Sequence, residues 1–329
     1  MTPPFEIVKH IKDWKNHDQQ RDKTLLALKA GEALAKRRKL KDAAERFCPS
    51  APLLDAINAA LVTRTPLLLT GEAGTGKTQV AWYLKRYFDI ELFEYQVNSN
   101  SQAKDMRYDF DAVAYLRDAY LTQNAAGDNA ESNTNNHHDR RTDPRYLKKR
   151  ALWEAYDTTE PCILLIDEVD KAPRDFPNDL LQELDQNRFE HPFNHGEHVE
   201  CKGSPPITII TSNGERRLPD AFLRRCMVHH IELDKTLLKE ILNAWDCQFP
   251  NLKQDERDEA LIIFKEIRTL RQLSKKPGTA ELLLWLSVLS AQEITYTQLK
   301  SRKHIPALEC LIKDQDDKQQ VKAHYDSSS

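Results

Sequence analysis

One stretch of this chain constrains its fold more than any other, namely residues 66–88, PLLLTGEAGTGKTQVAWYLKRYF. It begins with the apolar segment at 66–70, which predicts a short buried strand. The glycine-rich segment GEAGTGKT follows at 71–78, and an amphipathic helix is predicted over 79–88. A strand, a tight glycine-rich turn and a helix form a recurring unit of α/β proteins, so the chain is expected to build a sheet of parallel strands.

The same alternation continues on both sides of that stretch. Further apolar runs predict strands, and segments with apolar spacings of three and four predict helices. The predicted strands are 91–97, 162–167, 207–213 and 227–233, and the predicted helices are 52–64, 151–157 and 177–186. Apolar strands separated by helices are typical of a parallel sheet that is covered on both faces. We therefore predict an α/β domain over residues 48–234.

The N-terminal leader and one internal segment differ from this domain. Residues 1–47 are dense in charge and have the apolar spacing of a helix, with nine basic and four acidic residues between Arg21 and Arg46. We favour a solvated helix packed on the main body, and the alternative is a docking surface for a partner or a nucleic acid. Residues 122–145 are almost free of apolar side chains and predict a long exposed loop or a disordered insertion, which includes His137 and His138.

The C-terminal part of the chain predicts a second, helical domain. After Asp234 the predicted strands stop, and three segments with helical apolar spacing follow. We assign residues 235–315 to this domain. The last residues, 316–329, are polar, and we expect this tail to fray.

Composition excludes several classes of protein. The chain has 329 residues and a net charge of −3, so the molecule as a whole is not a general binder of polyanions. No apolar run approaches the ~20 residues that span a bilayer, and the first residues lack the apolar core of a signal peptide. The six cysteines are scattered without a CxxC pair, which is typical of reduced thiols. We therefore predict a cytoplasmic protein that does not associate with membranes.

The glycine-rich segment matches the pattern G-x-x-x-x-G-K-[ST] between a predicted strand and a predicted helix, which is the context that this pattern requires. Its backbone N–H groups and the start of the helix present positive potential to phosphate oxygens. Lys77 is expected to reach the β- and γ-phosphates, and the Thr78 hydroxyl is expected to bind Mg²⁺. The predicted cofactor-binding residues are Gly71, Glu72, Ala73, Gly74, Thr75, Gly76, Lys77 and Thr78.

Polar side chains follow two other predicted strands. Asp167 and Glu168 come at the end of the apolar run CILLID, and Asn213 ends the run ITIITSN. Ligands of open α/β sheets bind at the carboxyl ends of the strands, so Asp167 is expected to hold Mg²⁺ directly or through water. Glu168 is then placed to polarise a water molecule for attack on the γ-phosphate, and Asn213 to orient that water.

The order of these motifs resembles that of an AAA+ ATPase. Along the chain the glycine-rich loop comes first, followed by LLIDEVDKAP, then a strand that ends in TSN, and then AFLRRC. Within that group the chain is similar to the MoxR-type branch. Three segments carry this second resemblance, at 98–111, 146–157 and 170–192, and the whole match covers about residues 49–290.

The resemblance implies a three-layer α/β domain with strand order 5-1-4-3-2 and a helical lid. It also implies ATP bound between the subunits of a homo-oligomeric ring, usually a hexamer. Such proteins act as chaperone-like remodellers of partner proteins, including proteins with a von Willebrand factor type A domain. In the family an arginine after the fourth strand reaches the nucleotide of the neighbouring subunit. That position matches Arg225 better than Arg224. The resemblance thus implies three catalytic residues, Glu168, Asn213 and Arg225.

The chain departs from the family at the lid. Many members carry a second arginine at the start of a lid helix, where this chain has Thr279 or Ala280. Lys275 and Lys276 lie close by in the sequence, but a lysine offers a point charge rather than a bidentate fork.

The segment 191–201 is a second candidate site, because its histidines and cysteine could bind zinc. His191, His195, His198 and Cys201 are suitable ligands for zinc. The segment also predicts a hairpin with a turn at 194–196, in which His191 and His195 lie on one face and His198 on the other. We favour the hairpin, with its tip as a pore or substrate contact by resemblance alone.

The leading hypothesis is therefore an ATP-hydrolysing ring that remodels a partner protein. The alternative is a nucleic-acid motor or loader, for which the basic leader would supply phosphate contacts. GTP as the nucleotide and a switch that does not hydrolyse its nucleotide stay open as further alternatives.

Overall fold

The structure is a computed structural model that describes residues 47, 49–125, 140–194, 196–233, 235–302 and 304–326. The predicted leader 1–47 lies outside these residues except for Phe47, and so do residues 126–139 with His137 and His138. The chain forms two compact units. One comprises Ala51–Gly71 and Leu84–His230, and the other contains Glu72–Tyr83 together with Ile231–Ser329.

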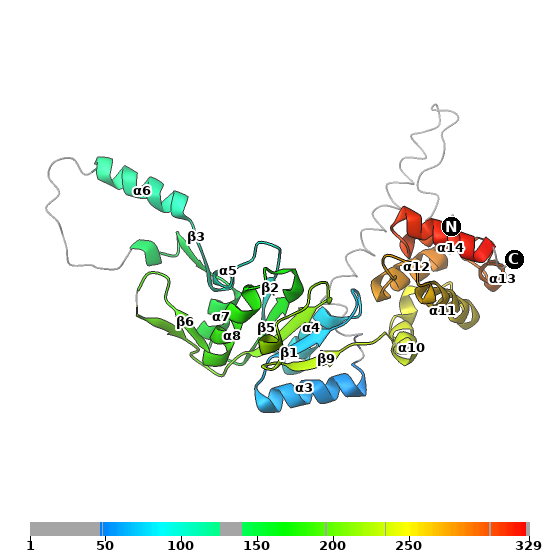
Figure 1. Ribbon diagram of the computed structural model, residues 1–329, viewed down its shortest axis with the longest axis horizontal. Coiled ribbons are helices and arrows are strands. Elements are labelled where there is room, and N and C mark those ends of the chain that lie inside the picture. The colour runs from blue at the N-terminus through cyan, green and yellow to red at the C-terminus, as the bar shows by residue number, and fades with distance from the viewer. Residues whose placement is uncertain are drawn as a thin grey trace. The chain divides into compact units, whose positions relative to one another are not determined.

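The first unit is built on a five-stranded sheet whose strands are all parallel (Figure 1). Its strands are β1 (Leu67–Thr70), β2 (Glu91–Gln96), β5 (Cys162–Asp167), β8 (Ile207–Ser212) and β9 (Met227–His230). Their spatial order is β2-β5-β8-β1-β9. Counted along the chain and read from the β9 edge, this order is 5-1-4-3-2, which confirms the predicted sheet. Two antiparallel pairs of short strands lie outside it.

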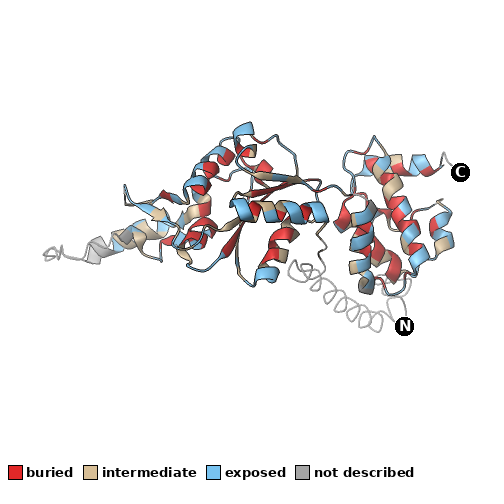
Figure 2. Ribbon diagram, turned by 90° about the horizontal axis from the view of Figure 1, so that it is seen from below, coloured by how far each residue is buried: buried red, intermediate tan, exposed pale blue. Residues whose placement is uncertain are grey.

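Helices cover both faces of the sheet because its central strands are buried on both sides. Leu164 and Ile166 of β5 belong to one apolar cluster with α7 (Ala151–Asp157) and α8 (Phe176–Gln186). Helix α3 (Ala51–Thr63) contacts β1 and β9 and buries Leu53, Ile57 and Ala60. Figure 2 shows the buried residues gathered on the strands and on the inner sides of the helices. The near-continuous apolar runs of the sequence follow from this double cover.

A projecting segment interrupts the first unit between β2 and α7. It contains α5 (Lys104–Arg107), α6 (Ala112–Ala125) and η2 (Arg140–Thr142), and β3 (Tyr108–Phe110) pairs with β4 (Leu147–Lys149). The expectation of a loop or disorder over 122–145 was wrong at its start, because residues 122–125 are the last turn of α6. The apolar residues of α6 precede the polar run, and the helix extends into it.

The remaining short elements of the first unit follow β5 and β8. They are η3 (Val169–Lys171), β6 (Arg188–Glu190), β7 (His198–Glu200) and α9 (Asp220–Leu223). Strands β6 and β7 form the hairpin predicted for this segment, with Phe189 paired to Val199.

The second unit contains the predicted helical domain. Its C-terminal helices are α10 (Lys235–Ala244), α11 (Gln254–Thr269), α12 (Thr279–Ala291), α13 (Tyr296–Lys300) and α14 (Gln315–Asp326), with the 3-10 turns η4 (Asp246–Gln248) and η5 (Leu308–Cys310). Helix α4 (Lys77–Phe88) begins in this unit and ends in the first. Trp285, Phe264 and Leu286 are fully buried in the apolar core of the second unit.

The expectation of a frayed tail was wrong for residues 315–326. These residues form α14, whose Val321 and Tyr325 are buried in the core of the helical unit. The two side chains are four residues apart and so lie on one side of the helix. Two apolar residues in a polar segment were too weak a signal to predict the helix.

The described part of the chain has no helix that is long and apolar enough to cross a bilayer. Among its cysteines, Cys162, Cys201, Cys226 and Cys310 are free thiols.

Candidate functional site

The glycine-rich loop follows β1 and ends where α4 begins, at Lys77. Gly74 and Gly76 have φ angles of +78° and +91°, which a residue with a Cβ rarely adopts. A Cβ on Gly76 would also lie 3.2 Å from the ring of Phe47, a tight contact that would require this ring to shift. The local backbone therefore requires the glycines that the sequence pattern carries.

The polar side chains of the loop turn back onto its own backbone. The Lys77 side-chain amine donates to the Glu72 carbonyl at 2.8 Å, and the Thr75 hydroxyl donates to the same carbonyl at 2.9 Å. Only 5% of Lys77 is exposed. A buried ammonium is a suitable donor for an anionic ligand, since a phosphate oxygen is a stronger acceptor than the neutral Glu72 carbonyl. The loop thus fits a phosphate group.

The sheet brings the predicted polar residues to one edge. Because β1, β5 and β8 are parallel neighbours, their carboxyl ends lie together. Gly71 follows β1, Asp167 ends β5 and Asn213 follows β8. The glycine-rich loop therefore leaves the sheet at the edge that carries Asp167 and Asn213, which is where ligands of open α/β sheets bind.

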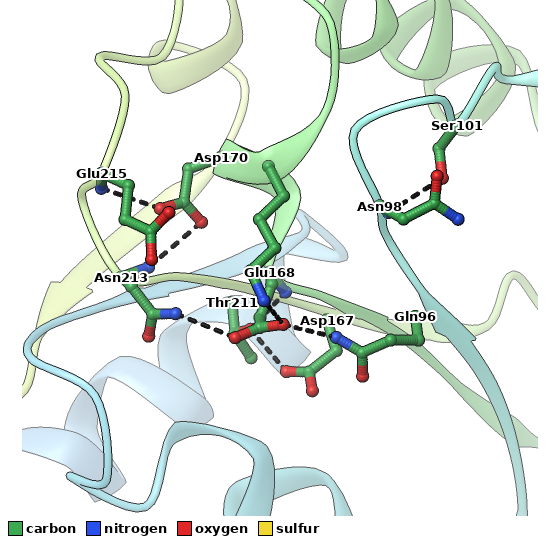
Figure 3. A network of polar contacts seen from close by, with 10 residues as sticks. Gln96, Asn98, Ser101, Asp167, Glu168, Asp170, Thr211, Asn213 and Glu215 are labelled. Carbon is green, nitrogen blue, oxygen red and sulfur yellow. Dashed lines mark hydrogen bonds and ion pairs between the residues drawn. The ribbon is translucent and has the colours of Figure 1, made fainter. Parts of the chain in front are cut away.

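Thr211 connects the two acidic residues at this edge (Figure 3). Its hydroxyl donates to Asp167 Oδ1 at 2.6 Å and accepts from the backbone N–H of Glu168 at 2.8 Å. Thr211 is 1% exposed. The hydroxyl therefore holds Oδ1 of Asp167 in place at the carboxyl end of β5, where a ligand such as Mg²⁺ would bind. No sequence pattern predicts this role, since a threonine inside a strand is ordinary.

Three side chains from different elements hold the carboxylate of Glu168. Asn213 Nδ2 donates to Oε1 at 3.0 Å, Gln96 Nε2 donates to Oε2 at 2.7 Å, and Lys171 Nζ donates to the same oxygen. The hydrogen bond to Glu168 raises the pKa of Lys171. Glu168 itself has a φ of +60°, a strained conformation for a residue with a side chain. Such strain persists where the surroundings demand one geometry, as at active sites.

A buried carboxylate, Asp170, positions Asn213. Its oxygens accept from the backbone N–H groups of Asn213 at 3.1 Å and Glu215 at 2.8 Å, and only 2% of the residue is exposed. The turn after β8 is therefore tied to the turn after β5. Sequence reasoning missed Asp170, Gln96 and Lys171 as members of the site, because each contacts it through tertiary structure.

Comparison with known families bears on this arrangement. A family model described as AAA domain (dynein-related subfamily) matches residues 66–226. This part of the chain is similar to an AAA domain. The match supports nucleotide binding, with ATP as the nucleotide.

Solved structures with a similar course of the chain include a proposed ATPase from Cytophaga hutchinsonii. It shares 12% identity, with 91% of this chain and 96% of that chain covered and a TM-score of 0.38. NtrX from Brucella abortus in complex with ATP shares 15% identity, with 96% and 69% covered and a TM-score of 0.36. No curated protein matches this chain.

Arg225 lies at the opposite end of the strands, away from Asp167. It precedes β9, whose first residue pairs with the first residue of β1, so it sits at the amino ends of the strands. Its Nε forms an ion pair with Asp185 Oδ2 at 2.9 Å. Asp220 pairs instead with Arg217 at 3.2 Å. The structure does not bring Arg225 to Glu168 or Asn213 of its own subunit.

The histidines of the β6–β7 hairpin have a structural explanation. His191 donates its backbone N–H to the Glu197 carbonyl at 2.9 Å, and its ring Nδ1 accepts from the backbone of Phe193 and Asn194. His195 lies outside the described residues. Among the residues that the structure describes, no group of three or more His, Cys, Asp or Glu side chains is placed to hold a metal ion.

Proposed function

We propose that this AAA domain binds ATP with Mg²⁺ and hydrolyses it. The observation that carries the proposal is the carboxylate of Glu168, which Asn213 holds beside Asp167 at the sheet edge where the glycine-rich loop departs. Hydrolysis of a phosphoanhydride requires a group that orients the attacking water and takes its proton. A binding switch has no need of a second acidic residue fixed in this way.

Each residue of the proposed site has one task. Lys77 exchanges the Glu72 carbonyl for phosphate oxygens, and Glu168 accepts the proton of the water that Asn213 helps to orient. Thr78 and Asp167 would hold Mg²⁺, which when bound neutralises phosphate charge. Thr211 keeps Asp167 in the rotamer that offers an oxygen to the metal.

The Glu168→Gln variant tests the proposal, because the amide keeps the shape of the side chain and cannot take a proton. We expect turnover, measured as phosphate release, to fall about 10³-fold, within the range of general base catalysis. ATP binding, measured by calorimetry, should stay within about threefold of the original protein. Absence of turnover by the original protein at concentrations where it oligomerises would refute hydrolysis.

We further propose that the protein works in the cytoplasm as a MoxR-type homo-oligomeric ring, with six subunits, on a partner protein. The support is the sequence resemblance and the position of Arg225. This arginine is half exposed and lies at the amino ends of the strands, whereas the proposed ATP site of its own subunit lies at their carboxyl ends. The expected partner carries a von Willebrand factor type A domain. Capture with the Glu168→Gln variant in ATP, followed by identification of bound proteins, tests this. Capture of nucleic acid instead would favour a motor or loader.

A further inference from the structure

The start of helix α12 meets the glycine-rich loop backbone against backbone. A Cβ placed on Gly278 would lie 2.4 Å from the Ala73 carbonyl oxygen, a distance that real Cβ atoms do not show. A Cβ on Gly74 would lie 3.4 Å from the backbone nitrogen of Thr279. The contact at Gly74 is an ordinary one, whereas the close approach at Gly278 requires glycine and allows the start of α12 to touch the loop directly.

One arginine binds both the segment before α12 and the glycine-rich loop. Arg268, in the last turn of α11, donates to the Pro277 carbonyl at 2.5 Å and to Glu72 Oε2 at 2.6 Å. Its side chain is 15% exposed, and its guanidinium lies 5.7 Å from the centre of the Phe264 ring. The planar fork of arginine suits two acceptors at once, which a lysine cannot match.

Glu72 transmits this contact to the nucleotide-binding lysine. Its carboxylate belongs to the ion pair with Arg268, and its carbonyl accepts from Lys77 and Thr75. When Lys77 exchanges the Glu72 carbonyl for a phosphate oxygen, the contacts of Glu72 change, and Glu72 is the residue that Arg268 holds. The reverse also applies, because coupling between two sites is reciprocal.

We propose that Arg268 is the positioning residue through which the helical unit senses the nucleotide and preorganises the loop. It acts from the end of α11, and it contacts Glu72 rather than the nucleotide. The start of α12, where Thr279 and Ala280 stand, carries no arginine for direct contact. This inference rests on the proposed ATP site.

The Arg268→Gln variant is expected to weaken ATP binding about tenfold, within the usual range of coupling between sites. Glu72→Gln removes the other half of the ion pair and should weaken binding similarly. The double variant should be no worse than either single one, because residues that act through one contact are not additive. Binding is measured by calorimetry under conditions without turnover, so that the result does not depend on hydrolysis.

Arg257→Gln is the matched control. Arg257 lies on the same helix with the same 15% exposure, pairs with Asp246 and donates to the Leu252 carbonyl. Its loss should lower the melting temperature and leave ATP affinity unchanged. Arg268→Lys should bind ATP with intermediate affinity, since it keeps the charge and loses one of the two contacts; it also provides a folded variant if Arg268→Gln proves unstable.

Two results would overturn the inference. One is an Arg268→Gln variant that behaves like Arg257→Gln, with lower stability and unchanged ATP affinity. The other is a double variant whose loss of affinity is the sum of the single losses. A protein that binds ATP with this coupling but never hydrolyses it would refute the proposed hydrolysis alone.

Discussion

The buried polar groups of the α/β unit and of the helical unit make different kinds of contact. In the α/β unit, Thr211 of β8 and Asp170 of η3 are buried and fix Asp167 and Asn213 at the carboxyl ends of β5 and β8. Parallel strands collect such side chains at one edge whatever their distance along the chain. This unit is therefore organised around a site.

In the helical unit the buried polar groups hold segments of the unit together. Asp317 of α14 accepts from the backbone N–H and the hydroxyl of Ser274, and Arg302 pairs with Glu259 and Glu266 of α11. The bonds of Asp317 anchor the segment that leads into α12. From this comparison we expect the residues that activate water to belong to the first unit and the contacts that hold the glycine-rich loop to the second, and the following variants test that division.

The largest effect is expected for Arg225→Ala. A finger arginine that stabilises charge in the transition state contributes roughly 10³-fold or more to turnover. ATP binding should persist, because Arg225 lies at the edge away from Asp167. Mixing this variant with Lys77→Ala subunits should restore part of the phosphate release, since each supplies what the other lacks.

Arg217→Ala is the control for that experiment. Arg217 is 85% exposed and pairs with Asp220 in the same turn, so its loss should leave turnover unchanged. Normal hydrolysis by Arg225→Ala would leave Arg225 as a structural partner of Asp185 and remove a main support for the ring.

The next effect concerns the core of the helical unit. Leu286→Ala should lower the free energy of unfolding by about 3 kcal/mol, because it removes a fully buried side chain and leaves a cavity. Urea unfolding followed by tryptophan fluorescence measures this. The half-buried Leu284 gives a matched control, for which Leu284→Ala should cost clearly less.

A smaller effect on turnover is expected for Thr211→Val, which keeps the shape of the side chain and removes the hydroxyl between Asp167 and Glu168. We expect kcat to fall about tenfold, as loss of one or two hydrogen bonds implies. Thr208→Val on the same strand removes only a bond to the Pro206 carbonyl and should leave kcat unchanged. Equal rates for the two variants would exclude Thr211 from the site.

The smallest effect is a pH dependence of the helical unit. The backbone N–H of Ser274 lowers the pKa of Asp317 below its ordinary value of 3.8. Because the folded pKa is the lower one, this stabilisation is complete above pH 3.8 and is lost as pH falls through the folded value. Asp317→Asn should therefore flatten the acid limb of a stability-versus-pH curve, whereas Asp316→Asn, at an exposed position, should not.

Much of the site could be predicted because its signals are local. The loop at 71–78 lies in one continuous stretch, and Asp167 and Asn213 stand where apolar strands end. The roles of Thr211, Asp170 and Arg268 could not be predicted in the same way. Each depends on a partner more than 40 positions away, and no short-range pattern marks such a pairing.

The amino-acid sequence by itself determined the strands, the helices and the glycine-rich turn, because periodicity and glycine backbone freedom act within a few residues. The tertiary structure decided which side chains meet. It paired Arg225 with Asp185, joined Arg268 to Glu72 and gave α14 a core to pack against. Those contacts form only after the sheet and the helical unit have brought distant segments together, since burial and ion pairing depend on three-dimensional surroundings.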